Sequence, residues 1–242
     1  MYRGRKIAVV MPVHNERSLV LAALASVPDF VDWVVVVDDF STDGSVDELF
    51  GLSAERVEII RHGENLGVGA SVKDGYKRAL ELGADIVAVM DGDGQMHPDD
   101  LQKLLDGVCD GFDYVKGNRF LDESIDKMPR IRYFGNRVLS LLMRLATGLE
   151  VDSQCGYTAI DRHLLQKLSL DEIYPRYGYL NSLLFQIVEH GASVGSAPVK
   201  TIYGKEISGI NPFVTVPTIL WIIFYGWFRS GVLGLLPKPR RC

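Results

Sequence analysis

The stretch "IVAVMDGDGQMHPDDL" (residues 86–101) contains a strand, a carboxylate-bearing turn and a helix start in immediate succession. Residues 86–90 form an uninterrupted apolar run, which is typical of a strand covered on both faces of a sheet. Pro98 and the aspartates after it suit the first turn of a helix, because proline lacks the amide that this turn leaves unpaired and acids are favourable near its positive end. The stretch therefore predicts a strand–turn–helix unit with Asp91 and Asp93 in its turn.

The same alternation of strand and helix continues through the first half of the chain. Further apolar, β-branched runs occupy 7–11, 33–37 and 57–60, and helical patterns occupy 16–26, 68–82 and 98–107. Alternating elements of this kind predict an α/β protein with a single doubly wound, mainly parallel sheet flanked by helices. In such sheets ligands bind beyond the carboxyl ends of the strands.

Polar clusters directly follow the expected strands, so all of them should meet at one edge of the sheet. They are "PVHNE" (12–16), "DDFSTDGS" (38–45), "NLGVG" (65–69) and "DGDGQ" (91–95). Each cluster alone has an ordinary explanation as a turn or a helix cap. Within the second cluster, Asp38 is expected to orient the turn by hydrogen bonds. Together, at consecutive strand ends, the clusters predict a binding site.

Composition narrows the class of protein. The 242 residues suit one large α/β domain, and a hydrophobic content of 47% supports a sizeable core. The net charge of −5 and the lack of a basic stripe interleaved with aromatic residues argue against a nucleic-acid partner. The cysteines, Cys109, Cys155 and Cys242, form no C-x-x-C pair, which excludes a disulfide framework or a zinc site and indicates a reducing, cytoplasmic environment.

Asp91 and Asp93 are the strongest metal-binding candidates. A calcium loop does not fit, because no acid stands at its fifth position and Gln102 occupies the twelfth. Two solvated aspartates this close would repel each other unless a cation lay between them. Their hard oxygen ligands, with Gln95 close by, suit Mg²⁺ or Mn²⁺ whose shell is completed by phosphate oxygens. The chain has neither the P-loop nor the dinucleotide-binding glycine pattern.

Taken in order and spacing, the strand-end motifs resemble glycosyltransferase family 2, which has the GT-A fold. The motifs are "VVMPVHNE" (9–16), "VVVVDDFSTDGS" (34–45), "NLGVGAS" (65–71) and "MDGDGQMHPDDL" (90–101). Later segments resemble a narrower group, the dolichol-phosphate mannose synthase-like enzymes, which transfer a sugar from a nucleotide to a polyprenyl phosphate. These segments are "KGNRF" (116–120), "FGNRVLSLL" (134–142), "DSQCGYTAI" (152–160) and "YGKEISGINP" (203–212).

The resemblance implies a role for each cluster. The nucleotide of a UDP- or GDP-sugar would be bound by Pro12, His14, Glu16, Asp39, Asn65 and Asp91. Asp91, Asp93 and Gln95 would surround a Mg²⁺ or Mn²⁺ that stabilises the charge developing on the departing nucleoside diphosphate. Asp91, Asp93 and Arg119 are the catalytic candidates.

A missing acid indicates the class of acceptor. Relatives that glycosylate a hydroxyl carry an Asp or Glu at the start of the helix after the acceptor loop, as the general base that a neutral alcohol needs. Here Tyr179, Leu180 and Asn181 occupy that region, and the Q-x-x-R-W motif of polysaccharide synthases is absent. A phosphomonoester, with a second pKa of about 6, is already ionised and needs no base. We therefore expect direct, inverting transfer to dolichyl or undecaprenyl phosphate.

An anionic acceptor requires cations. The resemblance implies that Arg119, Arg132, Asn136 and Lys205 bind the acceptor phosphate. Arg132 and Asn136 lie one helical turn apart, although neighbouring arginines make a solvated basic helix face the alternative. Relatives carry an arginine where Ile202 stands, and Lys200 or Lys205 is the expected substitute, without the bidentate fork of arginine.

The last expected element is an apolar C-terminal helix. We expect a catalytic domain at 1–211 and, at 212–242, a helix with a basic tail. Pro217 leaves only 218–228 as regular helix, too short to span a bilayer, which needs about 20 apolar residues. Trp221 and other aromatic residues favour the headgroup level, so the enzyme is expected to lie peripherally on the inner face of the membrane. A helix packed on the domain or in a homodimer is the alternative.

Two other functions stay open on the sequence alone. One is a family 2 glycosyltransferase that acts on a saccharide hydroxyl and takes its base from elsewhere. The other is a non-catalytic, sugar-nucleotide-binding partner subunit. The intact set of Asp91, Asp93 and Gln95 argues against the second.

Overall fold

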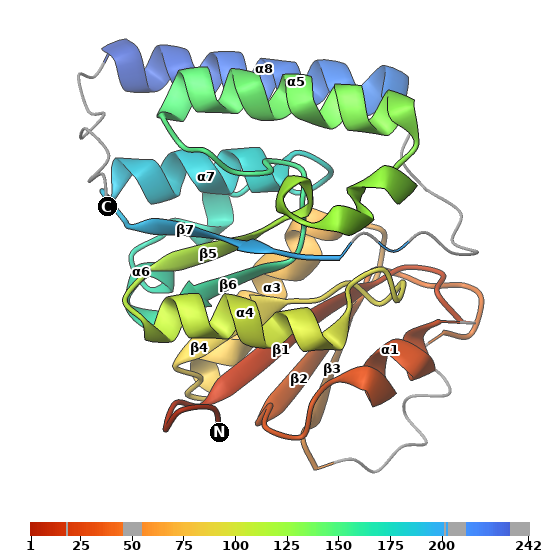
Figure 1. Ribbon diagram of the computed structural model, residues 1–242. Helices are drawn as coiled ribbons and strands as arrows, with labels where there is room; N and C mark the ends of the chain where they lie inside the picture. Colours follow the sequence, from red (N-terminus) through yellow and green to blue (C-terminus); the bar gives the residue numbers. More distant parts are fainter. Residues whose placement is uncertain (18, 46–54, 201, 203–211, 233–242) are drawn as a thin grey trace.

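The computed structural model describes residues 1–17, 19–45, 55–200, 202 and 212–232. Within them, seven strands form one sheet in the order β3-β2-β1-β4-β6-β5-β7 (Figure 1). The strands are β1 (Ile7–Val13), β2 (Trp33–Asp38), β3 (Val57–Arg61), β4 (Ile86–Val89), β5 (Tyr114–Asn118), β6 (Thr158–Asp161) and β7 (Val194–Pro198). Strand β6 runs antiparallel to β4 and β5, and the other neighbouring strands are parallel. The predicted mainly parallel sheet is confirmed.

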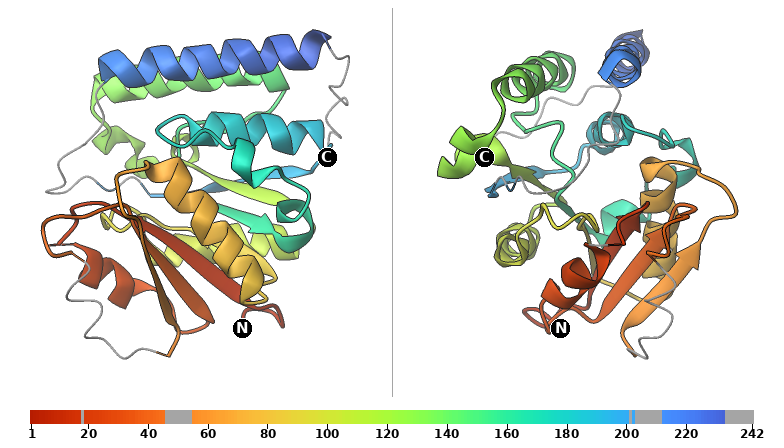
Figure 2. Two further views of the ribbon diagram at one scale, coloured as in Figure 1. Left: turned by 180° about the vertical axis from the view of Figure 1, so that it is seen from behind. Right: turned by 90° about the vertical axis from the view of Figure 1, so that its right-hand side faces the viewer.

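Helices cover both faces of the sheet (Figure 2). They are α1 (Val20–Ser26), α3 (Val68–Glu81), α4 (Pro98–Cys109), α5 (Arg130–Thr147), α6 (Arg162–Leu165), α7 (Tyr179–Glu189) and α8 (Pro212–Val232), with short 3₁₀ turns η1 (Arg119–Leu121), η2 (Glu123–Lys127) and η3 (Leu170–Glu172). Helices α3 and α7 contribute to the core on one face, whereas α1 and α4 contribute to the core on the other. The sheet is therefore doubly wound, as predicted.

The packing of strand β1 explains why its sequence is apolar throughout and does not alternate between apolar and polar residues. Ala8 and Val10 point into the core shared with α3, and Ile7, Val9 and Met11 point into the core shared with α1 and α4. All five side chains are fully buried. A strand covered on both faces can carry no polar residue along its length, so its first polar side chains appear only where it ends.

Helix α1 begins later than its sequence pattern predicts, at Val20 instead of residue 16. Asn15 has a left-handed backbone with φ of 58°, and the Arg17 amide donates to the Asp43 carboxylate at 2.9 Å. These residues bond to the loop after β2 rather than opening a helix. Glu16 consequently stays among the strand-end loops.

Helix α8 is longer than predicted, because Pro217 lies inside it and does not end it. An interior proline removes one hydrogen bond to the residue four positions earlier. Pro217 is the sixth residue of α8, so a single bond near the start of this 21-residue helix is lost. The Thr218 hydroxyl also donates to the Val214 carbonyl oxygen at 2.8 Å. Across the described residues, no helix combines the length and the apolar character that crossing a membrane requires.

Helices α5, α7 and α8 stack at one end of the molecule (Figure 2). Ile219 and Ile223 bury one side of α8. Gly226 of α8 lies against the ring of Phe185 of α7, with no room for a Cβ between them. Gly178, which precedes α7 with φ of 118°, approaches α8 as closely. The expected domain boundary between residues 211 and 212 adjoins residues outside the described part and stays a prediction.

Candidate active site

The loops after β1 and β2 are joined by hydrogen bonds at the carboxyl end of the sheet, on the right of Figure 1. The Asn15 amide donates to Ser41 Oγ, and the Thr42 amide donates to the Asn15 side-chain oxygen, both at 2.9 Å. The Ser41 amide in turn donates to Asp38 at 3.0 Å, so Asp38 orients this turn. Asn15 and Phe40 have φ of 58° and 62°, a conformation that costs non-glycine residues about 1–3 kcal/mol and is concentrated at functional sites.

Asp39 holds the loop after β3 in place. Its carboxylate accepts the backbone amides of Leu66 and Gly67, each at 2.8 Å. It also accepts a hydrogen bond from Nδ1 of His62 at 2.9 Å, while the other ring nitrogen of His62 lies 3.3 Å from Asp74. These three bonds make the buried Asp39 the residue that joins the end of β2 to the loop after β3.

His14 and Asn65, two predicted nucleotide-binding residues, lie side by side next to Asp39. Nδ1 of His14 donates to the Asp39 carbonyl oxygen at 2.8 Å, and Asn65 Nδ2 lies 3.4 Å from both ring nitrogens of His14. Pro12 is buried at the end of β1, where its carbonyl oxygen accepts the Gly92 amide at 3.3 Å. The polar clusters of all four predicted strands therefore converge.

Asp91, Asp93 and Glu16 form the acidic part of this edge. Asp93 Oδ1 accepts the Gln95 amide at 2.9 Å, which closes the turn. Burial, and then the charges of Asp93 and Glu16, raise the pKa of Asp91 to about 8. Asp93 and Gln95 also border a hollow of about 380 Å³ whose other wall is α1.

The chemistry of this carboxylate pair fits a hard divalent cation. The described residues contain no group of three His, Cys, Asp or Glu side chains close enough to hold a metal by themselves. Mg²⁺ and Mn²⁺ do not require such a group, because they use one or two carboxylates and complete their shell with water and substrate phosphates. A cation between Asp91 and Asp93 would also remove the repulsion that raises the pKa of Asp91.

Arg119 is held by a buried carboxylate. Its Nε and Nη2 donate to the two oxygens of Asp152 at 2.7 and 3.1 Å. Asp152 is fully buried and also accepts the Gln154 amide at 3.2 Å. The predicted catalytic arginine is therefore fixed in orientation by the segment "DSQCG" (152–156).

The same segment reaches Asp91. A Cβ on Gly156 would lie only 3.3 Å from Asp91 Oδ2. The fully buried Lys116 donates through Nζ to the carbonyl oxygen of Cys155, and burial lowers the pKa of Lys116 to about 8. A buried amine and a buried ion pair thus fix the segment that separates Arg119 from Asp91.

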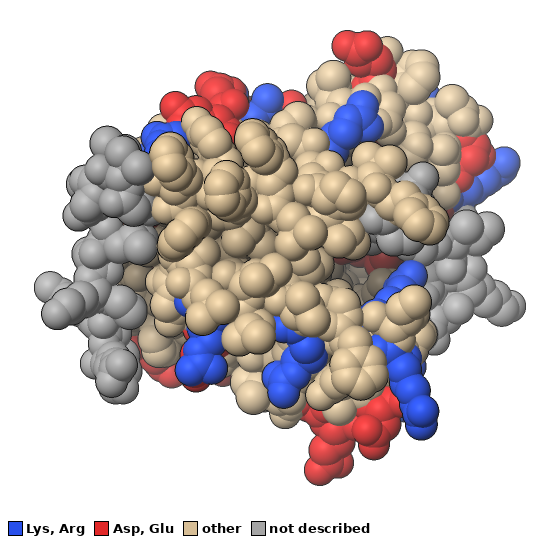
Figure 3. Space-filling model, turned by 90° about the horizontal axis from the view of Figure 1, so that it is seen from above, with Lys and Arg blue, Asp and Glu red and all other residues tan. Residues whose placement is uncertain are grey.

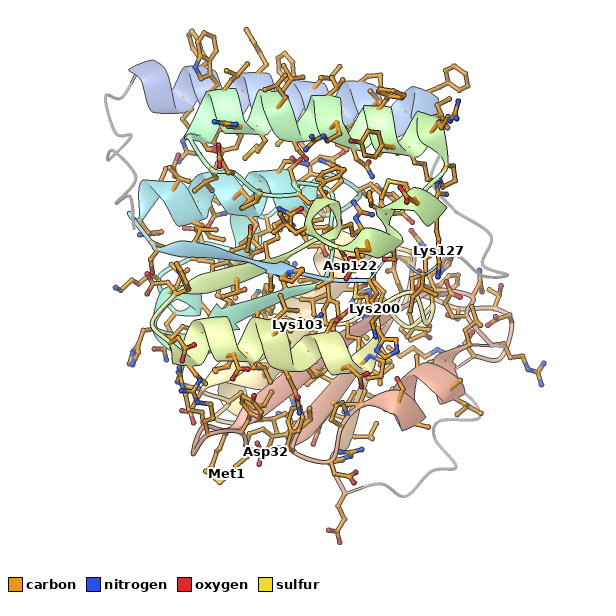
Figure 4. All side chains as sticks on the ribbon, in the orientation of Figure 1. Met1, Asp32, Lys103, Asp122, Lys127 and Lys200 are labelled. Carbon is orange, nitrogen blue, oxygen red and sulfur yellow. The ribbon has the colours of Figure 1, made fainter. Side chains whose placement is uncertain are left out.

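The other predicted acceptor residues are more dispersed. Arg132 is exposed and Asn136 half-buried on α5, a different element from that of Arg119. Lys205 lies outside the described residues. Lys200 lines a hollow of about 700 Å³ together with Lys127, between η2 and the end of β7 (Figure 4).

The start of α7 carries no acid. Tyr179, Leu180 and Asn181 are all buried there, and the first carboxylate of the helix is its last residue, Glu189. The side-chain oxygen of Asn181 accepts a hydrogen bond from Gln154 Nε2 at 3.3 Å. A neutral amide, and no carboxylate, therefore lies at the start of α7 in contact with segment 152–156.

Known proteins account for this combination of sheet order and strand-end clusters. The model of the family described as Glycosyl transferase family 2 matches residues 8–169, which include every cluster that converges here. The chain belongs to glycosyl transferase family 2. It is thus a glycosyltransferase, and the predicted family is confirmed.

Several relatives of this glycosyltransferase are named for polyprenyl-phosphate chemistry. The UDP-N-acetylglucosamine--dolichyl-phosphate N-acetylglucosaminyltransferase of Methanococcus voltae is 31% identical over 215 residues, 81% of this chain and 86% of the relative. The polyprenol monophosphomannose synthase of Mycolicibacterium smegmatis is 28% identical over 219 residues, 86% and 83% of the two chains.

Among solved structures, the glycosyltransferase resembles the glucosyl-3-phosphoglycerate synthase of Mycobacterium tuberculosis in complex with Mn²⁺, UDP and glucosyl-3-phosphoglycerate. The TM-score is 0.72 at 18% identity, covering 97% of this chain and 82% of the other. The two proteins share the GT-A fold.

The sequence did not reveal every contributor to the site of this glycosyltransferase. His62 and Asp152 are buried polar residues in the loops after β3 and before β6. The signals that could have revealed them are their places in "RHGEN" (61–65), directly after an expected strand, and in the motif "DSQCG" (152–156). Arg176 contacts Asn65 from 111 positions away, and no local pattern in "YPRYG" (174–178) predicts that contact.

Proposed function

We propose that this glycosyltransferase moves a sugar from a UDP- or GDP-sugar to a polyprenyl phosphate such as dolichyl or undecaprenyl phosphate. The observation that carries the proposal is the buried Asn181 at the start of α7, where transfer to a hydroxyl would require a carboxylate base. A phosphate acceptor arrives already ionised. The names of the relatives from Methanococcus voltae and Mycolicibacterium smegmatis support the same class of acceptor.

The donor would lie against the strand-end loops. His14, Asn65 and Asp39 contact one another at the strand ends and would bind the nucleoside, together with Pro12 and Glu16. Asp91, Asp93 and Gln95 would hold Mg²⁺ or Mn²⁺, which supplies Lewis-acid stabilisation of the charge on the diphosphate.

The proposed reaction is a single displacement. An oxygen of the acceptor phosphate attacks the anomeric carbon while the bond from that carbon to the diphosphate oxygen breaks, and the nucleoside diphosphate leaves with the electron pair. Arg119 would bind and orient the acceptor phosphate; in support, segment 152–156 holds this arginine through Asp152 at one end and approaches Asp91 through Gly156 at the other. Arg132, Asn136 and either Lys200 or Lys205 would add to the same site. The anomeric configuration is inverted.

A lipid acceptor requires a surface that meets the membrane, and the outer faces of α5 and α8 form one (Figure 3). Exposed apolar side chains on this α5–α8 face are Ile131, Phe134, Val138, Leu141, Leu145, Phe213, Trp221, Phe224, Tyr225, Trp227 and Phe228. Tryptophan and tyrosine favour the headgroup level. Exposed arginines, including Arg130, Arg137 and Arg229, accompany them, and each contributes about 1 kcal/mol near anionic lipid. We propose that this face rests on the cytoplasmic surface of the membrane.

Transfer of labelled sugar into organic solvent tests the proposed function. Full-length protein, Mn²⁺ and radiolabelled UDP- or GDP-sugars are incubated with a polyprenyl phosphate or with the matching free polyprenol. We expect lipid-soluble label with the phosphate alone. Equal transfer to the free polyprenol would establish a hydroxyl acceptor, and binding without transfer or hydrolysis would indicate a non-catalytic subunit.

A further inference from the structure

Segment 174–178, just before α7, packs closely on the loop after β3. Gly69 lies against the carbonyl oxygen of Tyr174, and Gly67 lies against the side chain of Arg176. Neither glycine has room for a Cβ, and Gly67 also has φ of 100°, a conformation that favours glycine. The two glycines of "NLGVG" therefore allow segment 174–178 to pack against the donor side of the site.

Arg176 reaches the nucleotide-binding side chains from this segment. Its Nη1 donates to the side-chain oxygen of Asn65 and its Nη2 donates to the backbone oxygen of Asn65, both at 3.2 Å. Asn65 in turn contacts His14. A guanidinium has five N–H donors, and Arg176 remains exposed, so the two bonds fix its orientation and leave donors for a ligand.

The residues that follow on the chain lie at the metal-binding end of the site. A Cβ on Gly156 would lie 3.3 Å from the carboxylate of Asp91 and 3.9 Å from the hydroxyl of Tyr179, so both groups border the same point. Burial, and then the nearby charge of Asp91, raise the pKa of Tyr177. Residues 176–179 thus run from the nucleotide-binding side chains to the carboxylates, along the path that a donor diphosphate would follow.

We propose that Arg176 binds the phosphate groups of the donor's nucleoside diphosphate, between Asn65 and the carboxylates of Asp91 and Asp93. The inference rests on the proposed sugar-nucleotide donor and adds a residue to its binding site. The planar fork of arginine matches two phosphate oxygens, and two of its donors are already oriented by Asn65. A diphosphate placed beside several carboxylates also needs a cation in addition to the metal, because like charges at short distance repel.

Calorimetry of donor binding, without acceptor, tests the contact. Full-length wild-type protein and Arg176→Ala are titrated with UDP, GDP and the corresponding nucleosides in the presence of Mn²⁺. Arg176→Ala is expected to weaken diphosphate binding about 10- to 100-fold, as the loss of a charge-assisted hydrogen-bonded contact does, while nucleoside binding is unchanged. Arg176→Lys keeps the charge but lacks the planar fork, so its affinity for the diphosphate should lie between those of the wild type and Arg176→Ala.

Arg3→Ala is the matched control, because Arg3 is an exposed arginine whose ion pairs to Asp106 and Asp110 lie at the amino end of the sheet. Its diphosphate affinity should equal that of the wild type. An equal loss for nucleoside and diphosphate in Arg176→Ala would mean that Arg176 only positions Asn65, and unchanged diphosphate affinity would overturn the contact outright. Wild-type protein that binds neither UDP nor GDP would instead overturn the donor class, so the two failures are distinguishable.

Discussion

Arg119 and Asp152 form a two-point ion pair, in which Nε and Nη2 of the guanidinium lie 2.7 and 3.1 Å from the two carboxylate oxygens. Asp152 is fully buried, whereas the side chain of Arg119 is 20% exposed. One arginine therefore neutralises a buried carboxylate and is also the proposed ligand of the acceptor phosphate. Replacing Arg119 alone would mix the two effects.

A double variant separates them. Arg119→Ala should lower the free energy of unfolding by about 3 kcal/mol, because removing one partner leaves an unpaired buried charge. Arg119→Ala combined with Asp152→Ala should regain much of that stability, since the orphaned charge is gone, and transfer should stay lost in both variants. Urea unfolding and the transfer assay measure the two properties. Transfer restored in the double variant would remove Arg119 from the acceptor site.

Asp93→Ala should abolish metal-dependent transfer and change stability by less than about 1 kcal/mol, because the side chain lies in a turn beyond β4. Asp99→Ala is the matched control, since Asp99 is a 76% exposed acid a short distance along the same stretch. The control should be as active as the wild type and as sensitive to EDTA. Near wild-type transfer by Asp93→Ala, with EDTA harmless, would contradict the metal assignment.

The raised pKa of Asp91, about 8, predicts a pH dependence of definite sign. Aspartate in an unfolded chain titrates near about 3.9, so folded protein retains this proton between the two values. The contribution of Asp91 to stability is fully present below about pH 4 and is lost as pH rises through its folded pKa. Mn²⁺ competes with the proton, so its stabilising effect should grow over the same interval.

Thermal unfolding with and without Mn²⁺, at a series of pH values across that interval, measures this effect. Asp91→Asn carries no titrating group at this position and should show neither trend. A Mn²⁺ effect in the wild type that stays constant with pH would be inconsistent with Asp91 as a ligand.

The α5–α8 face predicts sedimentation with anionic liposomes. Leu145→Glu, at a side chain that is 72% exposed, should weaken this binding because it places a carboxylate in the apolar face. Gln102→Glu adds the same charge to an exposed position of α4 and should have no effect. Truncation after Asn211 should remove binding and reduce transfer to long-chain acceptors more than to short ones.

Full-length protein that stays in the supernatant at low salt would rule out the membrane contact. A homodimer through the α5–α8 face would then be the better explanation, and light scattering would detect it as a doubled mass that Leu145→Glu reduces.

The stereochemistry of the product tests the single displacement. A donor with an α-linked sugar should give a β-linked sugar phosphate, because the acceptor oxygen attacks opposite the departing diphosphate. NMR of the purified lipid product reports the anomeric configuration. An α-linked product would require a second displacement and hence a nucleophile on the enzyme.

The sheet was predictable because its information is local. A strand such as β1, buried on both faces, must be apolar from end to end, and the polar residues that interrupt the pattern mark the edge where ligands bind. The prediction that regular helix starts only after Pro217 was wrong for a related reason. The effect of a proline depends on its distance from the start of the helix, which the local pattern does not give. The contact between Asn65 and Arg176 could not be predicted, because the two residues are 111 positions apart and neither local pattern indicates the other.

Helix α7 has its first residue, Tyr179, near Gly156 and Asp91 and a middle residue, Phe185, against Gly226 of α8. Helix α7, and then α8 itself, therefore lie between Tyr179 and the outer face of α8 that is proposed to touch lipid, and the axes of packed helices are about 8–10 Å apart. With the proposed membrane contact, the acceptor phosphate would leave the headgroup plane by about the depth of these two helices, and only the first isoprene units would follow it. An enzyme that contacts only the phosphate and the first isoprene units cannot distinguish acceptors by the number of units that remain in the bilayer. It should therefore accept polyprenyl phosphates of different lengths with similar efficiency once they share a membrane with it.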